Sequence, residues 1–166
     1  TKKLSKQPTA CFYGLALIAH DSLNHFHNLD SSYRYINEAE KPVKLLSPKK
    51  DTAKNILEIG IGDYRVKNGG SIKLWKDYFT NAQIYALDII PKHRVLDELV
   101  NNKRVVLFTN TNAYNENFFN ENILKKNLQF DFMLDDGPHT LESMKTFIRL
   151  YSKVMTDDGI LIIEDV

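Results

Sequence analysis

A chain of 166 residues can form one domain with a substantial hydrophobic core. Its net charge of +1 provides no basic surface of the kind that binds nucleic acid, and its single cysteine excludes an internal disulfide framework. No apolar stretch approaches the length of a membrane span. We therefore expect a globular protein of the cytoplasm, with no nucleic-acid partner and no membrane association.

Residues 1–53 are expected to form a helical cap and a connector. An apolar run at residues 10–19 weakly resembles a signal peptide, but it is interrupted and no cleavage-like site follows it. We therefore predict an amphipathic helix over residues 9–27 that covers the rest of the protein. Residues 54–166 are expected to form the ligand-binding core of the same compact domain.

Strand and helix patterns alternate in this second part of the chain. Short apolar runs predict strands at residues 56–59, 82–87, 104–108, 130–134 and 159–163. Apolar residues at helical spacing predict helices at residues 71–79, 92–101, 117–128 and 140–155. Ser71 is the predicted N-cap of the first of these helices. The alternation predicts the α/β class, as a doubly wound, Rossmann-like parallel sheet with helices on both faces.

The first two strands end in residues that suit a nucleoside. The first runs into Glu58-x-Gly60-x-Gly62, whose glycines let the backbone turn and approach a ligand closely. The second ends in Asp88, whose two carboxylate oxygens can accept from adjacent ribose hydroxyls. A dinucleotide fingerprint would place a third glycine where this chain has Arg65, so we expect a nucleoside ligand without a pyrophosphate.

The last two strands both end in acids. These acids are Asp135, Asp136, Glu164 and Asp165. A strand, a helix and a second strand form a right-handed crossover, so the two strands should be parallel, and as neighbours they would carry their acids to one crevice. His139 follows Asp136 by three residues and adds a candidate base.

Together these segments resemble the class I S-adenosylmethionine-dependent methyltransferases. More narrowly, they resemble the metal-dependent sugar O-methyltransferases of macrolide antibiotic pathways, the mycinamicin and macrocin type. The resemblance covers about residues 55–166. It is carried by Leu57–Gly62 followed by Gly69-Gly70-Ser71-x-x-x-Trp75, by Asp135-Asp136-Gly137-x-His139, and by Ile163-Glu164-Asp165.

The resemblance implies a role for each matching residue. The implied cofactor-binding residues are Glu58, Gly60, Gly62, Ser71, Asp88, Ile89, Thr111, Asn112 and Asp135. The implied ligands of Mg²⁺ or another divalent cation are Asp136, Glu164 and Asp165, and His139 is the implied catalytic base. Near the adenine, the family usually carries an acid and a glutamine where this chain has Thr111 and Asn112.

The implied activity is S-adenosylmethionine-dependent O-methylation, dependent on Mg²⁺, of a sugar hydroxyl on a glycan or glycosylated metabolite. Two alternatives stay open, namely a catalytically incomplete domain that only binds S-adenosylmethionine and a methyltransferase that acts on a non-sugar small molecule. A dehydrogenase-like nucleotide enzyme is a third reading, and the missing third glycine disfavours it.

Folds of this class continue through a further helix and two more strands after the fifth strand. Without them, residues 160–163 would form an open apolar edge, and such edges invite pairing. We expect this edge to be covered by further chain or by a second copy of the protein in a homo-oligomer.

Overall fold

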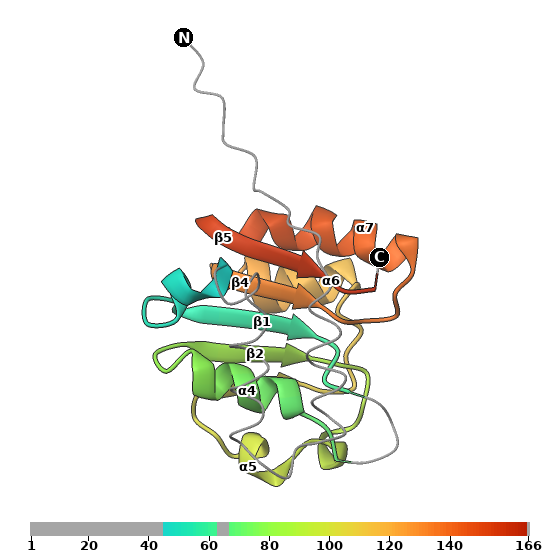
Figure 1. The fold of residues 1–166 in the computed structure, drawn as a ribbon. Helices are drawn as coiled ribbons and strands as arrows, with labels where there is room; N and C mark the ends of the chain where they lie inside the picture. The colour runs from blue at the N-terminus through green and yellow to red at the C-terminus, as the bar shows by residue number, and fades with distance from the viewer. Residues whose placement is uncertain (1–44, 63–66, 166) are drawn as a thin grey trace.

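A computed structural model describes residues 45–62 and 67–165 of the protein (Figure 1). The helix predicted at residues 9–27 lies outside the described residues, and the division between residues 53 and 54 stays a prediction. A short 3-10 helix, η1 (Ser47–Lys49), precedes the first strand. No helix in the two described stretches is long and apolar enough to cross a membrane.

Five parallel strands form the sheet of the described part, in the order β3-β2-β1-β4-β5. They are β1 (Asn55–Ile59), β2 (Gln83–Leu87), β3 (Val105–Phe108), β4 (Phe130–Asp135) and β5 (Met155–Ile163). The chain runs from β1 outward to β3 and then returns to the other side of β1 as β4. Ligands of such sheets bind at this reversal, outside the carboxyl ends of the strands. The predicted Rossmann-like α/β sheet is confirmed, and so is the pairing of the two strands that end in acids.

Helices cover both faces of the sheet (Figure 1). One face carries α4 (Gly70–Tyr78) and α5 (Asp97–Val100), and the other carries α6 (Glu116–Phe119) and α7 (Leu141–Tyr151). Successive residues of β1 point to opposite faces, so Ile56 belongs to the core under α4 and Leu57 to the core under α7. Both faces of the sheet are therefore apolar, as in other parallel sheets.

The helix predicted at residues 92–101 is interrupted. The chain forms a 3-10 turn, η2 (Lys92–Arg94), and becomes helical again only in α5. The two residues between them are extended because this stretch pairs with Asn68. The Asn68 amide donates to the Arg94 carbonyl over 2.7 Å, and the Leu96 amide donates to the Asn68 carbonyl over 2.9 Å. A partner from a distant part of the chain thus overrides the local helical pattern.

The two helices on the other face are shorter than predicted. α6 continues into a π-helical stretch (Asn120–Leu124) and does not reach residue 128, and Leu124, which belongs to the apolar pattern of this helix, is 39% exposed. α7 ends at Tyr151 and is followed by a 3-10 turn, η4 (Ser152–Val154), and β5 begins at Met155, earlier than the predicted residue 159. The backbone hydrogen bonds of β5 with β4 take over where the helical pattern would have continued.

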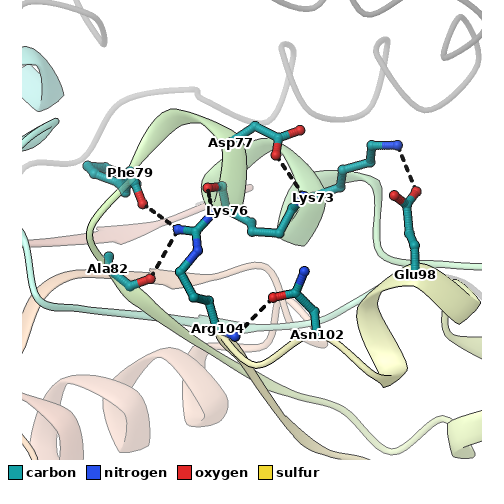
Figure 2. A network of polar contacts seen from close by, with 8 residues as sticks. All are labelled: Lys73, Lys76, Asp77, Phe79, Ala82, Glu98, Asn102 and Arg104. Carbon is teal, nitrogen blue, oxygen red and sulfur yellow. Dashed lines mark hydrogen bonds and ion pairs between the residues drawn. The ribbon is translucent and has the colours of Figure 1, made fainter.

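Arg104, the residue before β3, connects the end of α4 to the sheet (Figure 2). Its guanidinium donates to three backbone carbonyls in and after the last turn of α4, those of Lys76 (2.7 Å), Phe79 (3.0 Å) and Ala82 (3.3 Å). Its own amide donates to the Asn102 side chain over 2.9 Å. Carbonyls at the end of a helix lack partners within the helix, so a cation at this position stabilises α4.

Replacing Arg104 by alanine is expected to lower the free energy of unfolding by about 2–3 kcal/mol, because charge-assisted hydrogen bonds are lost and part-buried carbonyls are left unpaired. Arg149→Ala is a matched control that breaks an exposed ion pair with Glu116 (3.1 Å), and such pairs contribute about 0–1 kcal/mol. Urea denaturation measures both variants. Equal losses would contradict the role given to Arg104.

Candidate functional site

A pocket of about 550 Å³ opens at the carboxyl ends of the strands, within the range of roughly 300–1,000 Å³ typical of small-molecule sites. Loops after β1, β2, β3 and β4 and the start of α7 form its walls. Six of the nine predicted cofactor-binding residues line it: Gly60, Gly62, Asp88, Ile89, Thr111 and Asn112. The other three, Glu58, Ser71 and Asp135, do not line it.

Gly60 allows the loops after β1 and β4 to touch. It has a φ of 93°, and a Cβ at this position would collide with the backbone carbonyl oxygen of Asp136. The Asp136 amide donates to the Ile59 carbonyl over 2.9 Å, which holds the two loops together. Only glycine satisfies both the backbone angle and the close approach, so Gly60 places Asp136 against the glycine turn.

Asp88 holds the loops around it as well as facing the pocket. It is 8% exposed, and its carboxylate oxygens accept from the backbone amides of Ile61 (2.6 Å) and Ile90 (3.0 Å). Each carboxylate oxygen can accept a further hydrogen bond, so this geometry is compatible with the predicted ribose contact. The neighbouring Ile89 is 58% exposed and gives the pocket an apolar surface.

Glu58 is buried behind the pocket and contacts α4. It is 1% exposed, and its two carboxylate oxygens accept from the Ser71 hydroxyl and the Trp75 indole N–H. The prediction that Ser71 is the N-cap of α4 is wrong, because Gly69 occupies that position with a φ of 115°. Burial raises the pKa of Glu58 to about 8, and Asp136 and Asp88 add to the rise, whereas the two hydrogen bonds lower it.

Asp135 is turned toward the loop after β3. It is 2% exposed, and its carboxylate accepts from the hydroxyl of Tyr114. Burial raises the pKa of Asp135 to about 6, against the lowering effect of the hydrogen bonds from Tyr114 and the Gly137 amide. Burial and the charge of Asp135 raise the pKa of Tyr114 far above its usual range, so the Tyr114 hydroxyl remains a donor.

The three predicted metal ligands and the predicted base meet beside the pocket. Glu164, which is 2% exposed, shares a hydrogen bond with the side chain of Asp136. Burial and the charges of Asp136 and Glu58 raise the pKa of Glu164 well above its usual range. His139 Nε2 lies 3.5 Å from Asp136 Oδ1 and 3.7 Å from Asp165 Oδ2. Asp136 belongs both to this cluster and to the pocket wall.

These acids are not arranged as a ready-made metal centre. Within residues 45–62 and 67–165, no group of three or more His, Cys, Asp or Glu could hold a metal ion. The donor chemistry nevertheless fits a hard cation: Glu164 Oε1 is buried, and among the described residues it has no hydrogen-bond partner. Clustered carboxylates repel one another, which a cation relieves. The metal ligands stay a prediction.

Comparison with known proteins identifies relatives for this arrangement, although no family model matches the chain. A mycinamicin VI 2''-O-methyltransferase from Micromonospora griseorubida is 34% identical over 112 residues, which is 66% of this chain and 26% of that protein. An 8-demethyl-8-(2-methoxy-alpha-L-rhamnosyl)-tetracenomycin-C 3'-O-methyltransferase from Streptomyces olivaceus is 28% identical over 66% of this chain and 27% of that protein. The chain thus spans about a quarter of the length of these curated relatives.

A solved structure of MycE methyltransferase from the mycinamycin biosynthetic pathway, in complex with Mg and SAH, matches with a TM-score of 0.64 and 27% identity. The match covers 74% of this chain and 30% of that chain. The chain is similar to sugar O-methyltransferases in sequence and in fold. The predicted resemblance is therefore confirmed, and the predicted enzyme class agrees with the names of these relatives.

The start of α7 adds pocket residues to this methyltransferase fold that carry no predicted role. Thr140 is the N-cap, and it forms a capping box with Ser143, whose amide donates to Thr140 Oγ1 over 3.1 Å. Thr140, Ser143 and Thr146 all line the pocket, and their spacing of three residues is the sequence signal that could have identified them. Leu141 and Ile148 belong to the apolar pattern that predicts this helix, but they are 68% and 38% exposed.

Proposed function

We propose that the chain is the S-adenosylmethionine-binding core of a methyltransferase that methylates a hydroxyl group of a glycosylated small molecule. The observation that carries this proposal is the double position of Asp136. It lines the pocket formed by the glycine turn, and its carboxylate lies 3.5 Å from His139 Nε2. A methyl donor in the pocket would therefore lie next to the group that can accept the proton of the hydroxyl.

The pocket residues fit S-adenosylmethionine chemically. Gly60 permits close approach to the backbone, Asp88 offers carboxylate oxygens to ribose hydroxyls, and the exposed Ile89 offers an apolar surface to the purine. Arg65 in place of a third glycine supports a ligand without a pyrophosphate. SAH is the ligand named for the MycE structure, which supports the same cofactor class here.

The reaction is an in-line displacement at the methyl carbon. The acceptor oxygen forms a bond to that carbon, the carbon–sulfur bond breaks, and its electron pair returns to sulfur. The hydroxyl proton passes to His139, whose Nε2 faces Asp136 and Asp165. Alignment of the acceptor with the methyl group is the larger task, because positioning can contribute about 7–11 kcal/mol.

Mg²⁺ or another divalent cation would be held by Asp136, Glu164 and Asp165. When bound, the cation supplies positive charge that makes a hydroxyl of the acceptor more acidic. The buried, unpartnered Oε1 of Glu164 supports this assignment among the described residues, and Mg is named in the MycE complex. The role of the three acids is to neutralise the cation and to set its place beside the pocket.

Two binding experiments and a screen test the proposal. Calorimetry should show binding of SAH and no binding of NAD; binding of NAD alone would replace the proposal with a dehydrogenase-like enzyme. A methyl-transfer screen of sugars, glycosylated compounds and phenols, with and without Mg²⁺, should give product with a glycosylated acceptor. SAH binding without any transfer would favour the second candidate, a domain that only binds the cofactor.

The edge of the sheet formed by β5 is where we predict a further strand to pair. β5 lies at one end of the strand order of the described part, and Leu161, Ile162 and Ile163 are buried on its faces. Pairing of this edge with a second copy of the protein stays a prediction, which light scattering of the protein in solution can check.

Replacing Asp88 by alanine is expected to weaken the binding of SAH by at least tenfold, because each charge-assisted hydrogen bond to the ribose contributes about 1.5–3 kcal/mol. Asp131→Ala is a matched control at the opposite end of the sheet. Asp131 also accepts from two backbone amides, those of Lys54 (2.7 Å) and Asn55 (3.1 Å), but it does not line the pocket. Unchanged calorimetric affinity in Asp88→Ala would show that the ribose assignment is wrong.

A further inference from the structure

A series of contacts joins the Asp88 side of the pocket to the ends of β4 and β5, which carry the acids Asp135, Asp136, Glu164 and Asp165. The Thr111 amide donates to the Asp88 carbonyl over 2.9 Å at the start of the loop that follows β3. Farther along this loop, the Tyr114 hydroxyl donates to Asp135 Oδ1. Asp135 also accepts on its backbone carbonyl from the Glu164 amide over 3.0 Å. The loop after β3 therefore reaches from the predicted ribose site to the strand ends that carry the acids.

Tyr114 is held in place by its own neighbours. Its amide donates to Asn112 Oδ1 over 3.0 Å. The carbonyl of the preceding residue, Ala113, accepts from the hydroxyl of Tyr151 in α7 over 2.9 Å. Ala113 and Tyr151 are 3% and 0% exposed, so this anchor lies in the core. The backbone that carries Tyr114 is thus fixed independently of its hydroxyl group.

Gly137 shows how closely the Tyr114 hydroxyl fits the segment after β4. A Cβ on Gly137 would collide with the hydroxyl oxygen of Tyr114 and would lie 3.0 Å from Asp135 Oδ1. Gly137 is not among the residues with a positive φ, so glycine is required here for space and not for backbone conformation. The hydroxyl therefore lies directly against the backbone between Asp136 and His139.

We propose that Tyr114 is a positioning residue, whose hydroxyl holds residues 135–139 so that Asp136 faces the pocket and His139 faces Asp136. The expected effect on kcat rests on the proposed function. The effect of the Tyr114 hydroxyl on residues 135–139 can be measured whether or not the proposed function is correct. If the Tyr114 side chain only filled space, its replacement by phenylalanine would leave residues 135–139 unchanged, because the two side chains differ only in the hydroxyl.

Amide hydrogen exchange of Tyr114→Phe tests the structural part by NMR. The amides of Asp136 and Gly137 are hydrogen-bonded, to the Ile59 carbonyl over 2.9 Å and to the Asp135 carboxylate, so both report on the segment. We expect their exchange to become about tenfold faster, the effect of losing one charge-assisted hydrogen bond. Tyr85→Phe is the matched control: it removes the hydroxyl of a half-buried tyrosine in β2 whose ring packs on Phe130, away from this loop, and the exchange of the two amides should stay unchanged.

Gly137→Ala provides a second variant if Tyr114→Phe does not fold, because the added Cβ displaces the hydroxyl while Tyr114 remains. It should accelerate exchange at Asp136. With an identified acceptor, Tyr114→Phe should lower kcat about 10–100-fold, a larger effect than its change in the KM for S-adenosylmethionine, although Tyr114 also lines the pocket. Unchanged exchange in Tyr114→Phe overturns the inference, as does equal acceleration in Tyr85→Phe. If Tyr114→Phe does not fold, unchanged exchange in Gly137→Ala overturns it. Failure of the wild type to bind SAH would overturn the proposed function and leave the exchange result valid.

Discussion

Replacing His139 by alanine is expected to lower the rate of methyl transfer by about 10²–10⁴-fold, because the variant lacks the group that takes the hydroxyl proton. The affinity for SAH should be unchanged, since His139 does not line the pocket. His139 has a φ of 51° and its side chain is 35% exposed, so His139→Asn is a useful companion variant that tolerates this backbone angle and also lacks the base. Steady-state kinetics and calorimetry measure the two effects.

Two further variants help to distinguish the role of His139 as a base from the role of Asp136 as a metal ligand. His93→Ala removes an exposed histidine from η2, away from the pocket lining, and should leave the rate unchanged. Asp136→Asn should abolish metal-dependent activity and leave most of the affinity for SAH, because the backbone of Asp136, which packs on Gly60, is retained. Activity that survives both EDTA and Asp136→Asn would point to a metal-free transferase with His139 as the base. A His139→Ala rate equal to that of the wild type would exclude His139 as the base.

Raising the pH from about 5 to 8 is expected to lower the free energy of unfolding by a few kcal/mol through Glu58. Burial raises the pKa of Glu58 to about 8 in the folded protein, against 4.5 as the ordinary value. Between these values the folded state holds a proton that the unfolded state has released, so stability falls as the pH rises. Each pKa unit corresponds to about 1.4 kcal/mol, and the loss ends above pH 8, where both states are ionised.

Glu58→Gln should remove the contribution of Glu58 to this slope. Glutamine keeps the shape of the neutral acid: its oxygen can accept from Trp75 and its amide can donate to the Ser71 hydroxyl. Urea denaturation at several pH values between 5 and 8 measures the slope in both proteins. The raised pKa values of Asp135 and Glu164 act in the same direction in both proteins, so the difference between the two slopes reports Glu58 together with its electrostatic effect on Glu164.

Asp158→Asn is the control for this measurement. Asp158 is an exposed acid that pairs with Lys49 over 2.7 Å, and its pKa is lowered by that lysine. Its contribution is present above the pKa of the unfolded state and is lost only in acid, so the slope between pH 5 and 8 should not change. Identical slopes in the wild type and Glu58→Gln would show that Glu58 is ionised in the folded protein at pH 5.

The positions of the residues that follow the carboxyl ends of the strands were predictable, because they depend on the local sequence pattern and on one topological rule. Each apolar run is short and is followed directly by the predicted site residues, as Ile59 is by Gly60 and Leu87 by Asp88. Parallel strands all end at the same edge of the sheet, so the residues that follow them lie along that edge, and those that follow neighbouring strands meet there. The sheet, the pocket edge and the neighbourhood of Asp136 and Glu164 therefore follow from the sequence.

The partners of individual side chains did not follow from the sequence, because they come from segments that meet only when the helices pack. The contact of Glu58 with Trp75 needs α4 in place, the pairing of Asn68 with Arg94 breaks a helix that its own pattern favours, and Tyr114 reaches Asp135 from another loop. Burial then sets the chemistry of these groups, since desolvation is the largest cause of the raised pKa values of Glu58 and Asp135. Local periodicity carries no information on such contacts, because they depend on which distant surfaces exclude water together.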